Sequence, residues 1–420
     1  MKLSYFYKII DFSIILLLVL SAGSLLFVFN RNICYAIFLA LLFLAFIFSR
    51  KKLRTREVNS ALLTGVTILF LFYINYIFAI SDQTINKYAY YFTVCTVSIL
   101  TFLYFKNDKE KDIFIKILHF ILKLILIHAV FNFFAYFFIK NNLSIISTVN
   151  NDYETFFNIF FYVPKKCIVS IFGFEFCRNQ GFFWEPGVLQ IFLNSLFFLE
   201  AFIFKKSKFL LIIIAFAILT TYSTTGLIIL LLQVVVYIYN EFKVNKLLFP
   251  FIIVSLIPIY LVLRVNIQDK VQGEKEASFQ KRFFDLTQPF FIAIENPLTG
   301  IGLDAEQFQK FRKEFYFTSS TLNYINNQTG VELKVSVIDK GSSNSVMFLL
   351  AATGFPTAIL FLYMFFKQQI IKDKKWLWMS IMLISVMSEP LLLRPFFFIF
   401  IVSGFMSTYQ KLMIHKQQFQ

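Results

Sequence analysis

The sequence predicts an all-α, polytopic integral membrane protein with about twelve transmembrane helices and two large extracytoplasmic loops that form an outward cap. Composition, the length of the apolar stretches and the distribution of charge predict this class. Of the 420 residues, 58% are hydrophobic and only 15% are charged, whereas a soluble domain is usually about half apolar and about a quarter charged. A chain of this length cannot bury so much apolar surface in a water-soluble core. The composition therefore excludes ordinary soluble enzymes, disordered chains and small disulfide scaffolds.

Apolar stretches recur along the whole chain, and a stretch of roughly 20 residues crosses the hydrocarbon layer as a helix. The predicted spans are residues 12–29, 33–49, 59–80, 88–105, 113–139, 187–204, 209–222, 226–239, 247–263, 345–366, 376–393 and 396–410. The polar segment 220–226 interrupts the apolar stretch between residues 209 and 239. Two half-length helices and one long tilted helix both fit this stretch.

The net charge of +16 would suggest nucleic-acid binding in a soluble protein, but here the cations follow the predicted loops. One alternate set of loops holds 21 cations and 8 acids, and the opposite set holds 17 cations and 16 acids. Because basic loops stay in the cytoplasm, we expect both termini to be cytoplasmic. The charge therefore indicates orientation, and the expected partner is the lipid bilayer and not nucleic acid.

Two predicted outer loops, at about 140–186 and about 264–344, are too long to be tight turns. Loops longer than about 15 residues are usually functional in a compact protein. We expect a single membrane domain over residues 1–420, with both loops on its outer side. In the second loop, residues 304–307 have the pattern of a helix N-cap with a capping-box partner. The helix that follows fits either the outer membrane interface or the rim of the bundle.

Cysteine and histidine residues predict little chemistry. Cys167 and Cys177 both lie in the first outer loop, where an oxidising exterior permits a disulfide but does not require one. The three His residues are too scattered for a metal site, and the chain has no Walker motif. We therefore expect no metal and no cofactor.

The strongest local motif is R-N-Q-G-F-F-W-E-P-G at residues 178–187, directly before an apolar span. Pro186 in the first helical position and Glu185 at the cap predict a helix start. An Arg beside the N–H groups of a helix start favours phosphate or pyrophosphate binding, and a nearby carboxylate is a candidate general base. Arg178 and Glu185 are therefore candidate catalytic residues, while Trp184 is either a sugar-stacking face or an interface anchor.

Further charged residues lie in the second loop and in the last hairpin. Arg282 precedes N-P-L-T-G-I-G at residues 296–302, and composition alone makes it a surface charge. Glu389 and Arg394 lie near the outer end of the last hairpin, where charges at membrane depth are paired or functional. These two residues either form an ion pair that stabilises the turn or contribute to a binding site.

Together these segments resemble the superfamily of O-antigen polymerases and O-antigen ligases, which are polytopic glycosyltransferases of bacterial surface polysaccharides. The segment from Arg178 through Gly181 to residues 185–187 resembles the polymerase pattern R-x-x-G…E-P-[GS]. Arg282 together with residues 296–302 resembles the stretch R…N-P-L-x-G-x-G.

The third resemblance is to the stretch H-N-S…x-G, at residues 343–345 and 353–354. The ligase pattern carries a His where this chain has Ser343. This difference favours a Wzy-type polymerase, and it leaves Glu185 as the better candidate for a base on the outer side.

The resemblance implies a substrate, namely an oligosaccharide repeat unit on undecaprenyl pyrophosphate at the outer face of the bacterial cell (inner) membrane. Arg178 and Arg282 would stabilise the pyrophosphate leaving group, and Glu185 would take the proton of the acceptor hydroxyl in a metal-independent, inverting transfer. The implied substrate-binding residues are Trp184, Gly181, Asn344, Ser343, Glu389 and Arg394. A chain-length regulator and a flippase are the implied protein partners.

Two other functions fit the architecture. An O-antigen ligase would attach finished polymer to a lipid core, and a lipid-linked oligosaccharide flippase or other transporter would move the substrate across the membrane. Transporters often place ionisable residues at mid-membrane, whereas here the spans are nearly free of charge. The product of a polymerase would be either O-antigen or capsule polysaccharide.

Overall fold

The computed structural model is predominantly helical. It describes residues 2–48, 53–106, 112–148, 152–158, 160–165, 167–171, 173–242, 257, 260–267, 276–314, 327 and 342–418. In this part of the chain, seven helical segments are long and apolar enough to cross a membrane, namely Arg31–Phe48, Thr55–Phe78, Ile85–Lys106, Ile113–Asn142, Pro186–Phe204, Ser345–Phe366 and Pro395–Ile414. Shorter apolar helices cover Lys208–Thr221, Thr224–Asn240 and Lys375–Ser388. The predicted class of a multi-pass helical membrane protein is confirmed.

Most predicted spans coincide with helices of the structure, one differs, and one lies mostly outside the described residues. The stretch 12–29 forms two helices, α1 (Lys2–Leu20) and α2 (Leu25–Phe29), because Gly23 adopts a φ of +127° that ends helical geometry. The stretch 209–239 forms two helices, so the single tilted helix is excluded. Most of the predicted span 247–263, and much of the second outer loop, lies outside the described residues.

The chain divides into two compact units. The first unit comprises Met1–Lys51, Tyr104–Asp269 and Ile371–Ser385, and the second comprises Lys52–Leu103, Lys270–Ile370 and Val386–Gln420. Each candidate motif of the sequence therefore belongs to one unit, because residues 178–187 lie in the first and Arg282, Ser343, Glu389 and Arg394 lie in the second.

The first unit is built around α7 (Pro186–Phe198), all of whose residues are buried. This helix contacts α6 (Ile113–Ile139), α8 (Lys208–Thr221) and α9 (Thr224–Phe242). The unit also contains α1, α2 and α3 (Arg31–Phe48). A helix buried on all sides must satisfy its polar side chains internally, and Asn194 does so by donating to Oε1 of Gln190 at 2.9 Å.

A π-helical turn, η2 (Leu199–Phe204), continues α7. Glu200 in this turn is buried, and Nε2 of His119 lies 2.7 Å from its carboxylate. The same carboxylate accepts a hydrogen bond from the backbone N–H of Ser207 at 2.8 Å. Because an isolated buried charge is costly, these contacts explain how an acidic residue is tolerated here: it closes the turn between α7 and α8.

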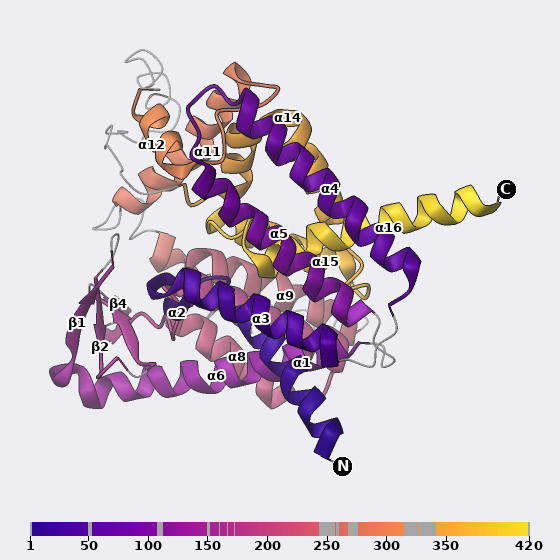
Figure 1. Cartoon of the computed structure of the whole chain (residues 1–420). Helices are drawn as coiled ribbons and strands as arrows, with labels where there is room; N and C mark the ends of the chain where they lie inside the picture. Colours follow the sequence, from indigo (N-terminus) through magenta and orange to yellow (C-terminus); the bar gives the residue numbers. More distant parts are fainter. Residues whose placement is uncertain are drawn as a thin grey trace. The chain divides into compact units, whose positions relative to one another are not determined.

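The first outer loop begins with the single turn η1 (Lys140–Asn142) and then forms short strands. The strands β1 (Ser144–Ser147), β2 (Asp152–Thr155) and β3 (Tyr162–Pro164) make one antiparallel sheet, and β4 (Ile168–Ile171) and β5 (Phe174–Cys177) make a second. Cys167 and Cys177 form a disulfide in the structure. Figure 1 shows the strands gathered at the C-terminal end of α6, where Phe161 and Val163 pack beside the disulfide against side chains of that helix.

The second unit contains α4 (Thr55–Phe78), α5 (Ile85–Lys106, whose last residues belong to the first unit), α11 (Glu276–Glu295), α12 (Ala305–Glu314), α14 (Ser345–Phe366) and α16 (Pro395–Gln418). The helix α15 (Lys375–Ser388) starts in the first unit, and its last residues belong to the second. The predicted helix after residue 304 is α12, and the backbone N–H of Glu306 donates to the side chain of Asp304 at 2.9 Å. Phe308 of this helix is fully buried against Ile292 and Ile301, which is packing against the bundle.

A break in α14 explains the glycine-rich segment 296–302. Gly354 has a φ of +73° inside α14, and a Cβ there would lie 2.4 Å from the carbonyl oxygen of Leu298. The backbone N–H groups of Ile301 and Gly302 donate to the carbonyls of Ala351 and Ala352, each at 2.9 Å. The N-P-L-T-G-I-G segment therefore satisfies the backbone groups that the break leaves without helical partners.

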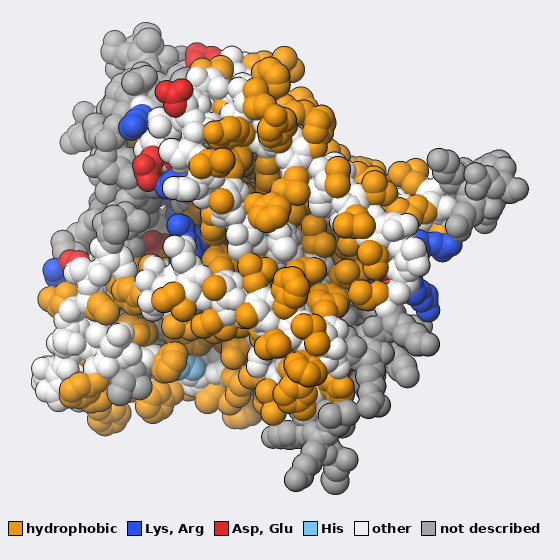
Figure 2. All heavy atoms as spheres, in the orientation of Figure 1, with side chains coloured by type: hydrophobic (Ala, Val, Ile, Leu, Met, Phe, Trp, Pro, Cys, Tyr) orange, Lys and Arg blue, Asp and Glu red, His pale blue; other side chains and the backbone are white. Residues whose placement is uncertain are grey.

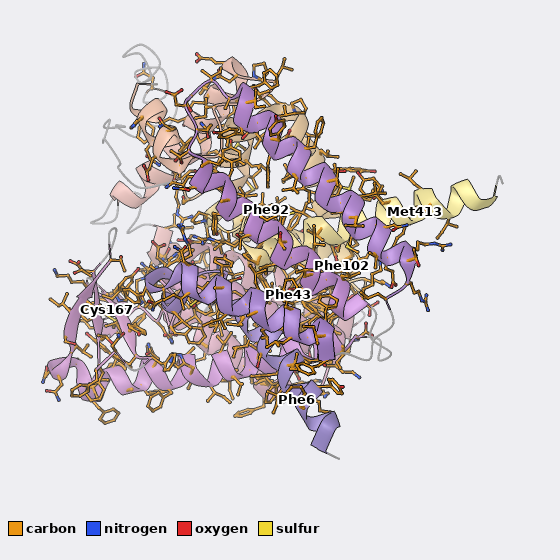
Figure 3. All side chains as sticks on the ribbon, in the orientation of Figure 1. Phe6, Phe43, Phe92, Phe102, Cys167 and Met413 are labelled. Carbon is orange, nitrogen blue, oxygen red and sulfur yellow. A yellow bond between two sulfur atoms is a disulfide. The ribbon has the colours of Figure 1, made fainter. Side chains whose placement is uncertain are left out.

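The outward faces of several helices are apolar and exposed. In the second unit, Leu62, Val66 and Phe70 of α4 are each about 60% exposed. In the first unit, Phe138 of α6 is 86% exposed. Figures 2 and 3 show hydrophobic side chains over the visible surfaces of α3 in the first unit and of α4 and α5 in the second. Apolar faces of this extent are typical of surfaces covered by lipid.

Candidate active site

Arg178 is held at the C-terminal end of α8. Its backbone N–H donates to the carbonyl of Cys167 at 2.9 Å, and its Nε donates to the carbonyl of Thr221 at 3.2 Å. Thr221 is the last residue of α8, where a helix carries unpaired carbonyls and a partial negative charge that favours a cation. The bond uses one of the five donors of the guanidinium group, and it fixes the position of the positive charge.

Asn179 is the most strongly tied residue of the motif, and the sequence analysis did not single it out. It is buried, and its side chain donates to the carbonyl of Ala129 at 2.8 Å and accepts from the backbone N–H of Gly181 at 3.1 Å. Its own N–H donates to the carbonyl of Thr220 at 3.0 Å. An Asn between an Arg and a Gly-containing turn was the available signal, because Asn side chains commonly close turns.

Gly181 is required by the backbone and not by contact with a ligand. Its φ of +57° lies in the left-handed region, and a Cβ at this position would lie at ordinary contact distance, 3.6 Å, from Nδ1 of His128. The structure thus gives Gly181 a turn-forming role and adds no observation for the predicted role in substrate binding.

Trp184 packs against the turn between α1 and α2. Its backbone N–H donates to the carbonyl of Gly23 at 3.0 Å, and a Cβ on Gly23 would lie 3.0 Å from the indole ring. The indole belongs to an apolar cluster with Leu25, Tyr153 and Tyr162. One side of the ring is therefore occupied by protein, and Trp184 serves as a packing anchor on that side.

Glu185 and Pro186 start α7 as predicted. Pro186 occupies the first turn, and Glu185 is the N-cap residue with extended backbone geometry. The Glu185 carboxylate is exposed and makes no side-chain capping bond. A carboxylate at a helix N-terminus is stabilised by the helix dipole, and this one is accessible to a hydroxyl of a substrate.

Arg282 lies on the exposed side of α11 in the second unit. Its Nη1 donates to the carbonyl of Ser388 at 3.4 Å, and Ser388 is the last residue of α15. Like Arg178, this arginine is therefore held at the C-terminal end of a helix. Its guanidinium is more exposed and its bond is longer, so it keeps more freedom to move.

Asp285, one turn after Arg282, is a residue that the sequence analysis missed. Its side chain is completely buried, and its Oδ2 accepts hydrogen bonds from the backbone N–H and from the hydroxyl of Ser343, at 2.8 and 2.6 Å. The available signal was an acidic residue on the side of the helix that carries Phe284 and Gln288, both of which are buried. Buried carboxylates are costly unless they are bonded, so this position is strongly specified.

Asn344 and Ser345 organise the start of α14. The Asn344 side chain caps the helix by accepting from the backbone N–H groups of Val346 and Met347, at 3.2 and 3.1 Å. The Ser345 hydroxyl donates to the carbonyl of Glu389 at 3.0 Å, which ties the last hairpin to this helix start. Glu389 is buried. Through these bonds, the predicted binding residues Ser343, Asn344 and Glu389 lie in one connected cluster near Arg282.

Arg394 lies next to Tyr90 of α5. Its Nη1 donates to the tyrosine hydroxyl at 2.9 Å, and its guanidinium lies 5.8 Å from the centre of that ring. Pro395 starts α16 directly afterwards. These contacts anchor Arg394 in the second unit and give it a cation–π partner.

The outer sheet of the first unit carries its own local electrostatics. The ammonium of Lys165 lies 2.9 Å from the Asp152 carboxylate, and this hydrogen bond, with a second from Ser147, lowers the pKa of Asp152 below its usual value. Burial raises the pKa of Glu154, and Lys165 partly opposes this effect. The surroundings of the sheet therefore explain the pKa shifts of both carboxyl groups.

The structure thus arranges the candidate residues in two clusters, one in each unit. The first cluster is the segment that contains Arg178, Gly181, Trp184 and Glu185, and Arg178 attaches it to the end of α8. The second brings Arg282 and Asp285 of α11 together with Ser343, Asn344 and Glu389, at the start of α14 and the end of α15. Each cluster contains one arginine fixed by a terminal helix carbonyl and one carboxylate close to it in sequence.

Comparison with protein families matches residues 209–362 to the family model described as O-antigen ligase. The matched segment runs from α8 into α14 and contains Arg282, Asp285 and Ser343. This match supports the superfamily of O-antigen polymerases and ligases. Its members are membrane glycosyltransferase-like enzymes, in agreement with the multi-pass helical architecture. No curated protein and no solved structure matches this chain.

Proposed function

We propose that this protein is a polysaccharide polymerase of the bacterial cell membrane. It transfers the growing glycan from undecaprenyl pyrophosphate to the incoming lipid-linked repeat unit on the outer face, and the product is O-antigen or capsule. The observation that carries the proposal is the cluster of Arg282, Asp285 and Ser343, which lies inside the segment matched to the O-antigen ligase family.

The reaction is a single displacement at the anomeric carbon of the growing chain. The acceptor hydroxyl forms the new bond to this carbon while the bond to the pyrophosphate oxygen breaks, and the electron pair leaves with undecaprenyl pyrophosphate. Inversion at that carbon follows from the single displacement. Catalysis then requires donors for the developing negative charge on the leaving group and a base for the acceptor proton.

The two arginines are the proposed donors. Arg178 and Arg282 are each oriented by the last carbonyl of a helix. Because these side chains are already ordered in the free protein, they lose less conformational entropy when they bind a ligand. Guanidinium groups suit pyrophosphate because they donate in a planar fork. In this proposal the protein supplies these charges itself, and the transfer proceeds without a metal ion.

Glu185 is the proposed base, and it would receive the proton of the acceptor hydroxyl. Its exposed position at the start of α7 leaves it accessible to a substrate. Asp285 is proposed as a positioning residue, because it acts on the reaction through Ser343, whose hydroxyl it fixes. Trp184, Gly181, Asn344, Glu389 and Arg394 remain proposed binding residues, several of which also have the packing and capping roles described above.

An O-antigen ligase is the second candidate, and the match to a family described as O-antigen ligase favours it. A ligase would use the same donor lipid and the same leaving group but would transfer finished polymer to a lipid core. Ser343 favours the polymerase, since the ligase pattern carries His at this place. A chain-length regulator and a flippase are the proposed partners of a polymerase.

Deletion of the gene, followed by electrophoresis of cell-surface glycans and lipid-linked intermediates, tests the proposal. A polymerase deletion leaves single repeat units on the final lipid. Polymer stranded on undecaprenyl pyrophosphate would instead show a ligase, and repeat units retained on the cytoplasmic side would show a flippase. Either of these last two outcomes would contradict the proposal.

Complementation of the deletion strain with Glu185→Gln tests the base separately. The amide keeps the shape of the side chain and removes its basicity, so polymer should fall at least about 100-fold while the protein level in membranes stays unchanged. Lys140→Ala, which removes another exposed charge of the same outer loop, is the matched control. Full activity of Glu185→Gln would remove Glu185 from the mechanism and leave the polymerase assignment standing.

A further inference from the structure

A cavity of about 330 Å³ lies in the second unit between the C-terminal part of α14 and the C-terminal half of α16. Its lining residues are Tyr363, Lys367, Gln369, Ser407, Thr408, Lys411 and Leu412. The volume lies at the lower end of the range for small-molecule sites. None of these residues belongs to the proposed active site.

Close backbone packing between the two helices gives the cavity a rigid base. A Cβ on Gly404 of α16 would lie 2.0 Å from the carbonyl oxygen of Met364 on α14, so these helices approach at the distance that only Gly permits. The Thr408 hydroxyl donates back to the Gly404 carbonyl at 2.9 Å. The backbone N–H of Gln369 donates to the hydroxyl of Ser403 at 3.3 Å and ties the segment after α14 to α16.

Two lysine side chains line this cavity. The ammonium of Lys367 lies 5.1 Å from the centre of the Tyr363 ring, and Lys411 of α16 also lines the cavity. Within the described part of the chain, no carboxylate forms an ion pair with either ammonium. Two cations that share one cavity repel each other, and an anion bound between them would offset this repulsion.

The surroundings point to a lipid as the source of that anion. Tyr363 and Leu412 line the cavity and remain 52% and 59% exposed, which is typical of side chains that contact acyl chains or the membrane interface. Figure 3 labels Met413, the residue after Leu412, on the part of α16 that continues towards the C-terminus. An apolar rim beside two cations suits a charged headgroup with attached acyl chains better than it suits a free ion.

We propose that this cavity binds the phosphate headgroup of an anionic phospholipid, with Lys367 and Lys411 on the phosphate and with Ser407 and Thr408 as polar neighbours. By the distribution of charge, both lysines belong to the cytoplasmic set of loops, so the lipid comes from the inner leaflet. The site does not depend on the proposed transfer reaction, since a ligase or a transporter with this structure would contain it as well.

The test uses the purified full-length protein in detergent, with its thermal unfolding midpoint followed during titration. Phosphatidylglycerol should raise the midpoint, because a ligand that binds the folded state stabilises it, and phosphatidylcholine should have a much smaller effect. In Lys367→Ala/Lys411→Ala, the phosphatidylglycerol concentration that gives half of the effect should rise about 30-fold. A titration of this double variant that matches the wild type would overturn the proposal.

Three controls separate the alternatives. Lys8→Ala/Lys372→Ala removes two exposed cations that lie outside the cavity on the same predicted side of the membrane. This variant should bind the lipid like the wild type. If it lost as much lipid affinity as the cavity variant, the result would show charge attraction without a site. Inorganic phosphate at matched concentration should not raise the midpoint, and an equal rise would show a phosphate site in place of a lipid site. Lys367→Arg/Lys411→Arg keeps both charges and should retain lipid binding, so it tests the site even if the alanine variant fails to fold. Loss of lipid binding in a folded arginine variant would contradict the assignment.

Discussion

Arg178 in the first unit and Arg282 in the second are held by the same type of contact but in different surroundings. Each donates to the carbonyl of the last residue of a helix, which is Thr221 for Arg178 and Ser388 for Arg282. The C-terminal end of a helix attracts cations because its last carbonyls lack partners. The shared contact shows how each unit orients a guanidinium group at the C-terminal end of a helix.

The two arginines differ in how strongly the surrounding protein holds them. Arg178 is followed by the buried and multiply bonded Asn179, and its own backbone N–H is paired with Cys167. Arg282 is exposed on α11, and the buried Asp285 follows it one turn later on the same helix. We therefore expect changes at Arg178 to affect both stability and activity, and changes at Arg282 to affect activity alone.

The largest expected effect is the loss of polymer in either alanine variant. Arg178→Ala and Arg282→Ala should each lower polymer formation about 100-fold or more, which is typical for removal of one preorganised donor. The thermal unfolding midpoint should fall in Arg178→Ala, because this half-buried side chain loses its 3.2 Å bond to the Thr221 carbonyl. It should change little in Arg282→Ala, because the bond to Ser388 is longer, at 3.4 Å, and is made by an exposed side chain. Equal midpoints for the two variants would contradict the difference between the clusters.

Lysine substitutions sharpen the comparison. Lysine keeps the charge but lacks the fork that lets one group bond a helix carbonyl and a ligand together. Arg178→Lys should therefore lose about 100-fold in activity, whereas Arg282→Lys, with a freer side chain, should lose only about tenfold. Glycan ladders from strains that express each variant at equal membrane levels measure this ratio, and a reversed order would show that Arg178 is not the more constrained donor.

Asn179→Ala tests how strongly the first cluster is built into its unit. The substitution leaves the N–H of Gly181 and the carbonyl of Ala129 without their partner, and it should cost about 2 kcal/mol of unfolding free energy. Gln180→Leu is the matched control, because the neighbouring amide is buried and no described protein group bonds it. A similar loss in both variants would show general sensitivity of this loop and not a role of the Asn179 bonds.

Asp285→Asn should have a smaller effect, confined to turnover. The amide keeps the size of the side chain but removes the charge that orients Ser343, so kcat should fall about tenfold with KM and the unfolding midpoint little changed. Ser343→Ala should lower kcat about threefold, and the double variant should resemble Asp285→Asn alone because the two residues act as one unit. Additive losses would contradict a positioning role that acts through Ser343.

The sequence predicted the helical membrane class well, because apolar length and charge asymmetry are properties of single segments. It also predicted the helix start at Glu185 and Pro186, and the superfamily from short motifs such as residues 296–302. It did not reveal that these motif glycines serve the break in α14, because that depends on the contact of Gly300 and Gly354 with distant backbone.

The second cluster shows the same limit. Asp285 is recognised only when Ser343, 58 residues later, is seen to donate to it. The packing of Trp184 on Gly23 likewise joins segments that no local pattern connects. A structural role that depends on the local sequence, such as the helix start at Glu185 and Pro186, was therefore predictable. A structural role that depends on a partner far away in the sequence was not.

Equilibrium binding of undecaprenyl pyrophosphate to the purified protein tests the central claim that the two helix-end arginines bind the pyrophosphate of the carrier. Undecaprenyl monophosphate serves as the comparison ligand, and Lys140→Ala as the control variant. We expect the wild type and the control to bind the pyrophosphate at least about tenfold more tightly than the monophosphate, and Arg178→Ala and Arg282→Ala each to lose most of this preference. Wild-type affinity and wild-type preference in both arginine variants would contradict the claim.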